Sequence, residues 1–175
     1  NLRYVNEQPE PFLDWLASHP ADLVVVQEVT DGWVRTLARL PGFPPIAPEK
    51  LAALQPDGVC LYGDGRKVAL AGKGPRGGLC AVYDFLERRV GCHWPEPGRE
   101  YLPKLSELKL NIDATNNPPF RYRGVGLHKA PGTEFFLQTV DWAGKNRINA
   151  VQFFCDDYDR LRPAALDALL DRGLL

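Results

Sequence analysis

GKGPRGGLCAVYDFLERR, residues Gly72–Arg89, is the stretch that decides the fold. Glycines dominate its first half, which is typical of a tight turn, and the second half has the composition of a helix. Apolar residues recur at helical spacing through and just beyond this second half, at Leu79, Val82, Tyr83, Leu86 and Val90. The spacing predicts an amphipathic helix that buries this stripe and turns Asp84 and the following charges away from it.

The residues before the stretch predict a β-hairpin. Val59–Tyr62 and Lys67–Ala71 are apolar runs on either side of a turn that contains Asp64-Gly65. Asp-Gly between two such runs is a strong signal for a tight turn between antiparallel strands. A helix that leaves a hairpin through glycines packs back across it, so we expect this unit to nucleate a sheet.

The same glycines have a second interpretation. Gly72, Gly74 and Gly77 form a G-x-G-x-x-G pattern between a strand and a helix, which is the fingerprint of a dinucleotide-binding turn. The preceding strand, however, pairs in a hairpin, and Pro75 removes one backbone N–H from the loop. The pattern therefore favours a tight strand-to-helix turn over a nucleotide site.

The remaining periodicity alternates between strands and helices. Helices are expected over residues 10–18, 30–40, 50–54, 134–145 and 163–171, and strands over 1–6, 22–29, 105–112, 120–127 and 147–154. Residues 91–103 are expected to be a loop anchored by Trp94 and Tyr101, and residues 113–119 a linker. The expected fold is α/β, with a mixed sheet and packed helices.

Composition excludes several classes of protein. The 175 residues carry a net charge of −1, which argues against a nucleic-acid or anionic-membrane surface. No apolar run is long enough to span a bilayer. The four cysteines are widely spaced and form no C-x-x-C pair, which favours reduced thiols and, with them, a cytosolic setting.

The first quarter of the chain resembles one enzyme family. NLRYVN (residues 1–6) and ADLVVVQEVTDGWVRTLARLPGFP (residues 21–44) resemble the opening of the endonuclease/exonuclease/phosphatase family of metal-dependent phosphoesterases. The resemblance implies that Glu28 ligates Mg²⁺ and that Asn1 lies beside the metal. A carboxylate at the end of a strand is a good ligand for a hard cation. The later GDxN and SDH segments of that family do not occur in this sequence, and the alternative for Glu28 is a solvated carboxylate.

A second and longer resemblance begins at Pro56. Residues 56–110 resemble the α/β domain that precedes the barrel in family 20-type hexosaminidases and in bacterial glycoside hydrolases with an α-glucuronidase-like N-terminal domain. The matching segments are Pro75–Gly77, Tyr83–Glu87, Gly91–Trp94 and Pro97-Gly98, with further single matches at Gly58, Gly72 and Pro103. In those enzymes this domain is structural and has no catalytic groups.

The resemblance continues into the start of a (β/α) barrel. FRYRG (residues 120–124) resembles its first strand and implies that Arg123 contacts sugar, whereas the alternative is a surface or ion-paired arginine. KNRIN (residues 145–149) resembles the next strand, and Asp156 and Asp157 follow it. On a barrel those carboxylates would lie at the reactive face and bind sugar hydroxyls or a cation; otherwise they lead into the last helix.

Three functions stay open. The leading hypothesis is a non-catalytic or incomplete portion of a glycoside hydrolase that binds carbohydrate and requires no cofactor, because only two strand–helix units are present and the family's catalytic carboxylate pair is not among them. The alternatives are a Mg²⁺-dependent phosphoesterase-like module and an engineered or interaction protein without small-molecule chemistry. The expected domains are residues 1–45, 46–115 and 116–175. The exposed edge of an incomplete barrel favours association into a homo-oligomer.

Overall fold

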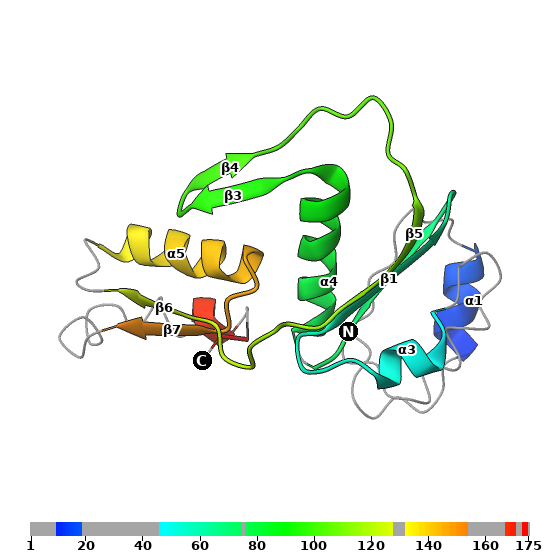
Figure 1. Ribbon diagram of the computed structural model, residues 1–175, viewed down its shortest axis with the longest axis horizontal. Helices are drawn as coiled ribbons and strands as arrows, with labels where there is room; N and C mark the ends of the chain where they lie inside the picture. The colour runs from blue at the N-terminus through cyan, green and yellow to red at the C-terminus, as the bar shows by residue number, and fades with distance from the viewer. Residues whose placement is uncertain are drawn as a thin grey trace. The chain divides into compact units, whose positions relative to one another are not determined.

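The computed structural model describes residues 10–18, 46–74, 76–127, 132–153, 167–170 and 173–174 (Figure 1). In chain order the elements are α1 (Glu10–Ser18), α3 (Pro48–Ala52), β1 (Val59–Asp64), β2 (Val68–Gly72), α4 (Gly77–Phe85), the π-helix η1 (Leu86–Val90), β3 (His93–Glu96), β4 (Arg99–Tyr101), β5 (Asn111–Asn116), β6 (Gly124–Leu127), α5 (Thr133–Lys145) and β7 (Ala150–Phe153). Helices occur with both antiparallel and parallel strand pairs, which confirms the mixed α/β fold.

The chain divides into two compact units. The first contains residues 1–85 and 107–118, and the second contains residues 86–106 and 119–175. The domain limits expected from the sequence stay a prediction, as does the start of a barrel. Each unit has its own apolar core, so each is described by itself.

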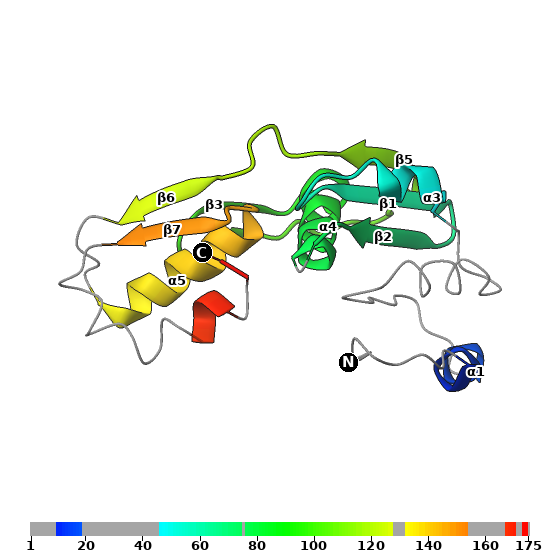
Figure 2. The ribbon, with the colours of Figure 1, turned by 90° about the horizontal axis from the view of Figure 1, so that it is seen from below.

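A three-stranded antiparallel sheet in the order β2-β1-β5 forms the centre of the first unit (Figure 2). The predicted hairpin is confirmed, with Val59 opposite Gly72 and Gly63 opposite Val68. Its turn depends on Asp64, whose Oδ1 accepts the backbone N–H groups of Lys67 at 2.9 Å and Arg66 at 2.8 Å. These two hydrogen bonds hold the pKa of the Asp64 carboxyl below its usual value.

Helix α4 packs on this sheet through a face other than the predicted one. Its buried residues are Gly77, Cys80, Ala81 and Asp84, whereas the predicted stripe from Leu79 to Val90 is only half-buried. The core of the unit consists of Val59, Leu61, Cys80, Ala81 and Ile112, with Val68, Leu70, Phe85 and Ala114 packed around it. The reason is steric, because the small residues let the helix lie close to the strands. Asp84 is buried with them, and its Oδ1 accepts Asn116 Nδ2 at 3.3 Å.

The glycine turn explains this close approach. A Cβ atom on Gly72 would lie 2.0 Å from the carbonyl oxygen of Gly77, and one on Gly77 would lie 2.2 Å from the carbonyl carbon of Gly72. Between them Gly74 has a φ of +87°, which favours glycine. The strand before the turn is paired antiparallel in the hairpin, so the tight strand-to-helix turn is confirmed.

The third strand of the sheet lies later in the chain than predicted. β5 covers residues 111–116, most of the expected linker, and pairs with β1 so that Val59 lies opposite Asn116. The expected strand over 105–112 is wrong, since residues 102–110 contain no strand and Leu105 and Leu108 are exposed. Polar side chains alternate with Ile112 and Ala114 along β5 because only one face of this edge strand contacts the core.

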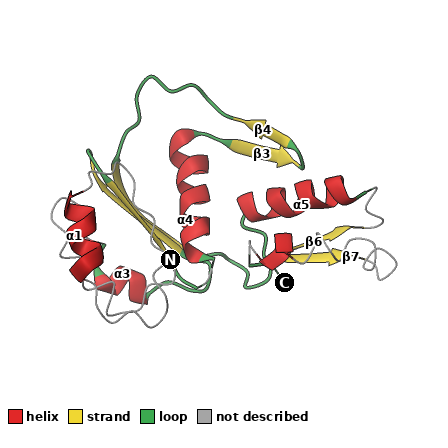
Figure 3. Cartoon of the chain, turned by 180° about the vertical axis from the view of Figure 1, so that it is seen from behind, coloured by secondary structure: helices red, strands yellow, loops and turns green. Residues whose placement is uncertain are grey.

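The second unit contains a strand–helix–strand arrangement. β6 and β7 pair in parallel, with Val125 opposite Val151, and α5 lies along them (Figure 3). The buried core residues are Phe136, Val140, Ala143, Val151 and Leu174. Phe136 and Val140 form the buried face of α5, and Trp142 packs against that core. Leu137 is partly exposed.

A short hairpin replaces the expected loop over residues 91–103. β3 and β4 pair antiparallel, with His93 opposite Tyr101 and the two rings stacked at a centroid distance of 6.1 Å. Trp94 is buried as predicted, but Tyr101 is 59% exposed and is therefore no anchor. The hairpin packs on α5, where a Cβ atom on Gly98 would approach the Gln138 side chain to 3.0 Å.

Replacing Gly77 by alanine should strongly destabilise the first unit. The added methyl group would overlap backbone atoms of Gly72, which cannot rotate away as a side chain can. We therefore expect Gly77→Ala to lower the free energy of unfolding by about 3 kcal/mol or more, despite the better helix propensity of alanine. Gly74→Ala is the matched control, because a Cβ there meets open space and only the positive φ opposes it, at a cost of about 1 kcal/mol. Urea unfolding of both variants measures the difference; equal losses would contradict the steric argument.

Candidate functional site

Four of the five residues predicted to form sites lie outside the described residues. These are Asn1 and Glu28, expected near Mg²⁺, and Asp156 and Asp157, expected to bind sugar. Their roles stay predictions. Among the described residues, no group of three or more His, Cys, Asp or Glu side chains is arranged to hold a metal ion. Nor does any helix in the described ranges have the length and apolar character needed to cross a membrane.

Three of the predicted reduced cysteines are described. Cys60, Cys80 and Cys92 are buried thiols outside any disulfide, in agreement with the prediction for these three, and Cys155 lies outside the described residues. Cys60 and Cys80 are completely inaccessible to solvent, so they behave as small core residues rather than as reactive thiols.

Arg123, the fifth predicted site residue, is half-buried directly before β6. Its Nε donates to the carbonyl oxygen of Arg147 at 2.8 Å, and its Nη1 donates to that of Phe120 at 2.7 Å. Two N–H groups of the guanidinium are therefore used on backbone carbonyls. In this geometry Arg123 connects the segments that lead into β6 and β7.

Asn149 completes this connection and was not singled out from the sequence. Its Oδ1 accepts the backbone N–H of Arg123 at 2.8 Å, and its Nδ2 donates to the carbonyl of Arg121 at 2.7 Å. The carbonyl of Arg123 in turn accepts the backbone N–H groups of Asn149 at 2.9 Å and Ala150 at 3.2 Å. Before β6 and β7, these side-chain hydrogen bonds replace the backbone bonds of a parallel ladder. Both strands therefore begin later than expected, at Gly124 and Ala150. An asparagine before a strand gives no sequence signal for such a role.

The connected segment carries two exposed aromatic side chains. Phe120 is 70% exposed and Tyr122 is 63% exposed. The guanidinium carbon of Arg121 lies 5.4 Å from the centroid of the Tyr122 ring, within the range of a cation–π contact. The segment thus holds two rings and a cation in solvent on a backbone fixed by hydrogen bonds.

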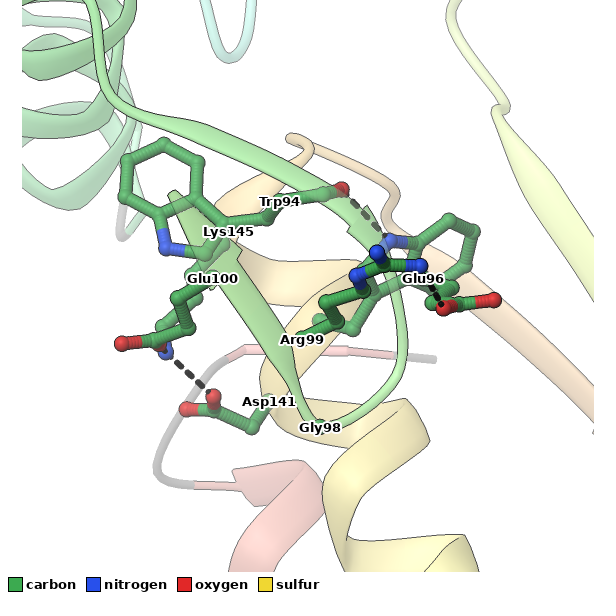
Figure 4. A pocket seen from close by; sticks show the side chains of 8 residues that line it. Trp94, Glu96, Gly98, Arg99, Glu100, Asp141 and Lys145 are labelled. Carbon is green, nitrogen blue, oxygen red and sulfur yellow. Dashed lines mark hydrogen bonds and ion pairs between the residues drawn. The ribbon is translucent and has the colours of Figure 1, made fainter. Parts of the chain in front are cut away.

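A small hollow lies between the β3–β4 hairpin and α5 (Figure 4). It is lined by Trp94, Glu96, Gly98, Arg99, Glu100, Asp141, Trp142 and Lys145. Its volume of about 80 Å³ is far below the several hundred Å³ of a typical ligand pocket. The carbonyl of Trp94 accepts Trp142 Nε1 at 2.8 Å and Asn146 Nδ2 at 3.1 Å, which attaches the hairpin to the helix.

The charges around the hollow are paired with one another. Arg99 lies beside Glu96, and Lys145 lies beside Asp141 (Figure 4). The N···O distances of these two ion pairs are 3.0 Å and 2.6 Å. Lys145 also pairs with Glu100. Burial by itself lowers the pKa of Lys145, but the hydrogen bonds to Asp141 and Glu100 outweigh it and leave that pKa above its usual value. Of these pairs, Lys145–Glu100 joins α5 to the hairpin, whereas Arg99–Glu96 lies within the hairpin and Lys145–Asp141 within the helix. The hollow is therefore a structural joint rather than a ligand site.

Comparison with known proteins adds no relative. No protein-family model matches the chain, and no curated protein matches it either. The two resemblances named above are therefore carried by the quoted residues alone.

Replacing Arg123 by lysine should destabilise the second unit. Lysine keeps the charge but has no Nε–H fork to reach both carbonyls, so we expect a loss of about 2 kcal/mol. Arg121→Lys is the matched control and should change stability by less than about 0.5 kcal/mol, because its side chain is exposed. Both are measured by urea unfolding. A stable Arg123→Lys protein would show that the two bonds do not matter.

The pairing of Lys145 should make stability depend on alkaline pH. Since its pKa in the folded protein is raised, the stabilisation is complete below the ordinary lysine value of 10.5 and is lost as the pH rises through the folded pKa. Lys145→Met should lower stability by up to about 1 kcal/mol at pH 8, and the difference from the unsubstituted protein should shrink toward pH 11 to 12. Thermal unfolding at both pH values tests this, with the exposed Lys104→Met as control. A difference that is independent of pH would contradict it.

Proposed function

We propose that this protein is a non-catalytic portion of a carbohydrate-active glycoside hydrolase, acting as a scaffold that binds sugar without cleaving it. The observation that carries the proposal is the parallel β6–α5–β7 unit, which occurs where the sequence resembles the first strand–helix units of a barrel. Parallel strands joined through a helix are the building block of such barrels.

Candidate sugar-binding groups flank this unit in the sequence. Arg123 comes directly before β6, whereas Asp156 and Asp157 follow β7 in the sequence. In folds built from parallel strands, ligands bind beyond the carboxyl ends of the strands, which is the position of the two aspartates in the chain. Arg123 lies at the amino end of β6, where its side chain bonds to backbone carbonyls, so a contact between Arg123 and sugar rests on the family resemblance alone.

Several observations on the described carboxylates support a binding role over a catalytic one. Glycoside cleavage needs a pair of carboxyl groups facing the bond, one as an acid and one as a base or nucleophile. Around the hollow, the carboxylates are held in ion pairs with Arg99 and Lys145, in a space too small for a sugar. Glu87, in η1, is paired with Arg147 at 2.5 Å.

Sugar binding without turnover is the expected result for the purified protein. We expect saturable heat on calorimetric titration with methyl glycosides of N-acetylglucosamine or glucuronic acid, and no release of nitrophenol from the corresponding aryl glycosides. Turnover that is abolished by changing one of the protein's own carboxylates would overturn the non-catalytic proposal, and the absence of binding to any sugar would overturn the carbohydrate assignment.

A second titration separates this proposal from the phosphoesterase alternative. Mg²⁺ is added to the protein and to Glu28→Gln, which removes the carboxylate charge at nearly constant size. Equal heats in the two proteins would exclude a magnesium site at Glu28, whereas heat that depends on Glu28 would favour the alternative.

A further inference from the structure

The segment Phe120–Tyr122 combines exposure with rigidity. Phe120 is the most exposed large apolar side chain among those described, and Tyr122 is nearly as exposed. Exposed aromatic rings on a mobile loop are common, but here the backbone on which they stand is fixed. Arg123 and Asn149 together make four hydrogen bonds to the backbone of residues 120, 121, 123 and 147, each between 2.7 and 2.8 Å.

Rigidity of this kind favours recognition. A surface that is already ordered loses little conformational entropy on binding, so more of the contact energy appears as affinity. The side chains of Arg123 and Asn149, which fix the segment, form their hydrogen bonds with backbone groups. They are therefore the support of the surface, and Phe120, Arg121 and Tyr122 are the groups that a ligand would meet.

The exposed groups determine the chemistry of the ligand. The face of an aromatic ring is negative and attracts the weakly positive C–H groups on the flat side of a pyranose. The guanidinium of Arg121 is held 5.4 Å from the Tyr122 ring, where it can form charge-assisted hydrogen bonds with a carboxylate on a sugar stacked beside it. A ring and a cation at this spacing fit a sugar that has one flat apolar face and one carboxylate.

The surroundings argue against a nucleic acid. Binding to a phosphate backbone depends on several cations that follow the strand, and the chain as a whole has a net charge of −1. Beside the exposed Arg121, the nearest cation in the sequence is Arg123, which is half-buried and spends two N–H groups on backbone carbonyls. Within the described segment Phe120–Tyr122, the single cation of Arg121 matches one carboxylate better than a run of phosphates.

We infer that Phe120, Arg121 and Tyr122 form a binding surface for acidic sugars, with the rings stacking on the pyranose and Arg121 pairing with the carboxylate of a uronic acid. This inference rests on the proposed function, namely that the protein binds sugar. It assigns the contact residues and the class of sugar to the segment before β6, at the opposite end of the strands from the carboxyl ends considered above.

The test compares methyl β-D-glucuronide with methyl β-D-glucoside, which differ only in the carboxylate. Calorimetric titration of the full chain should give a Kd for the glucuronide that is at least about tenfold lower than for the glucoside. Arg121→Gln should raise the glucuronide Kd about tenfold and change the glucoside Kd less than about twofold, because only the charged contact is lost. Tyr122→Ala should weaken both sugars about tenfold through the loss of stacking.

Matched variants control for position and folding. Arg89→Gln removes another exposed arginine of the second unit, and Tyr101→Ala removes a tyrosine that is 59% exposed on β4; neither should change either Kd. Thermal unfolding of each variant confirms that it is folded before it is titrated. Sodium acetate and a short oligouridylate serve as an anion without a sugar ring and as a stacking polyanion.

The outcomes separate this inference from the proposed function. Sugar binding that is unaffected by Arg121→Gln and Tyr122→Ala, or equal Kd values for glucuronide and glucoside, would overturn the inference while the proposed function stands. No binding of any sugar would overturn the proposed function and the inference with it. Acetate that competes as well as glucuronide, or oligouridylate that binds more tightly through the same residues, would assign the surface to other ligands and overturn the inference.

Discussion

The close approach of two backbones at Gly72 and Gly77 is the constraint on which the first unit depends. No side chain fits between these residues, so the strand must end and the helix must begin almost in contact. Once the helix starts there, its next turns lie close to the sheet, and small residues such as Cys80 and Ala81 fill the narrow interface. The distance between the layers is set first, and the choice of buried face follows from it.

Polar side chains help to hold the second unit together. Its parallel pair contains only β6 and β7, and isolated two-stranded sheets are marginal in water. Here the pair gains from α5, whose Phe136 and Val140 are completely buried against it, and from the side chains of Arg123 and Asn149, which continue the connection beyond the last backbone bonds. On the other side of α5, the hairpin is attached through the carbonyl of Trp94 and the ion pair between Lys145 and Glu100.

Local signals in the sequence predicted the elements that form through local contacts. The β1–β2 hairpin follows from Asp64-Gly65, and α5 follows from its regular apolar spacing; both are confirmed. The buried face of α4 was predicted wrongly, because hydrophobic periodicity weights Leu79 and Val82 above the glycine and cysteine that fit the interface. β5 was misplaced because its pairing with β1 joins residues between 47 (Asp64 with Asn111) and 57 (Val59 with Asn116) positions apart, and a polar edge strand has no strong pattern of its own.

The candidate site shows the same limit. A family resemblance singled out Arg123, but only the structure shows that its guanidinium is bonded to the carbonyls of Phe120 and Arg147. The role of Asn149 depends on the meeting of two segments that are distant in the sequence, so no local pattern announces it. The exposure of these side chains could not be predicted from the sequence either. The aromatic residues Phe120 and Tyr122 are typical of a buried strand, but β6 begins only at Gly124, and both side chains are exposed to solvent.

The state of the polar groups distinguishes the two regions that combine aromatic and charged residues. Around the hollow, each described cation faces a carboxylate of the same chain, so a ligand entering there would have to break an existing pair before making a new one. At Phe120–Tyr122, the hydrogen bonds named above are made by the backbone, while the guanidinium of Arg121 lies near the Tyr122 ring, where it can also pair with an incoming carboxylate. A ligand at Phe120–Tyr122 would therefore break few existing contacts. For this reason, and not because of the number of suitable residues, this segment is a better candidate for recognition than the hollow.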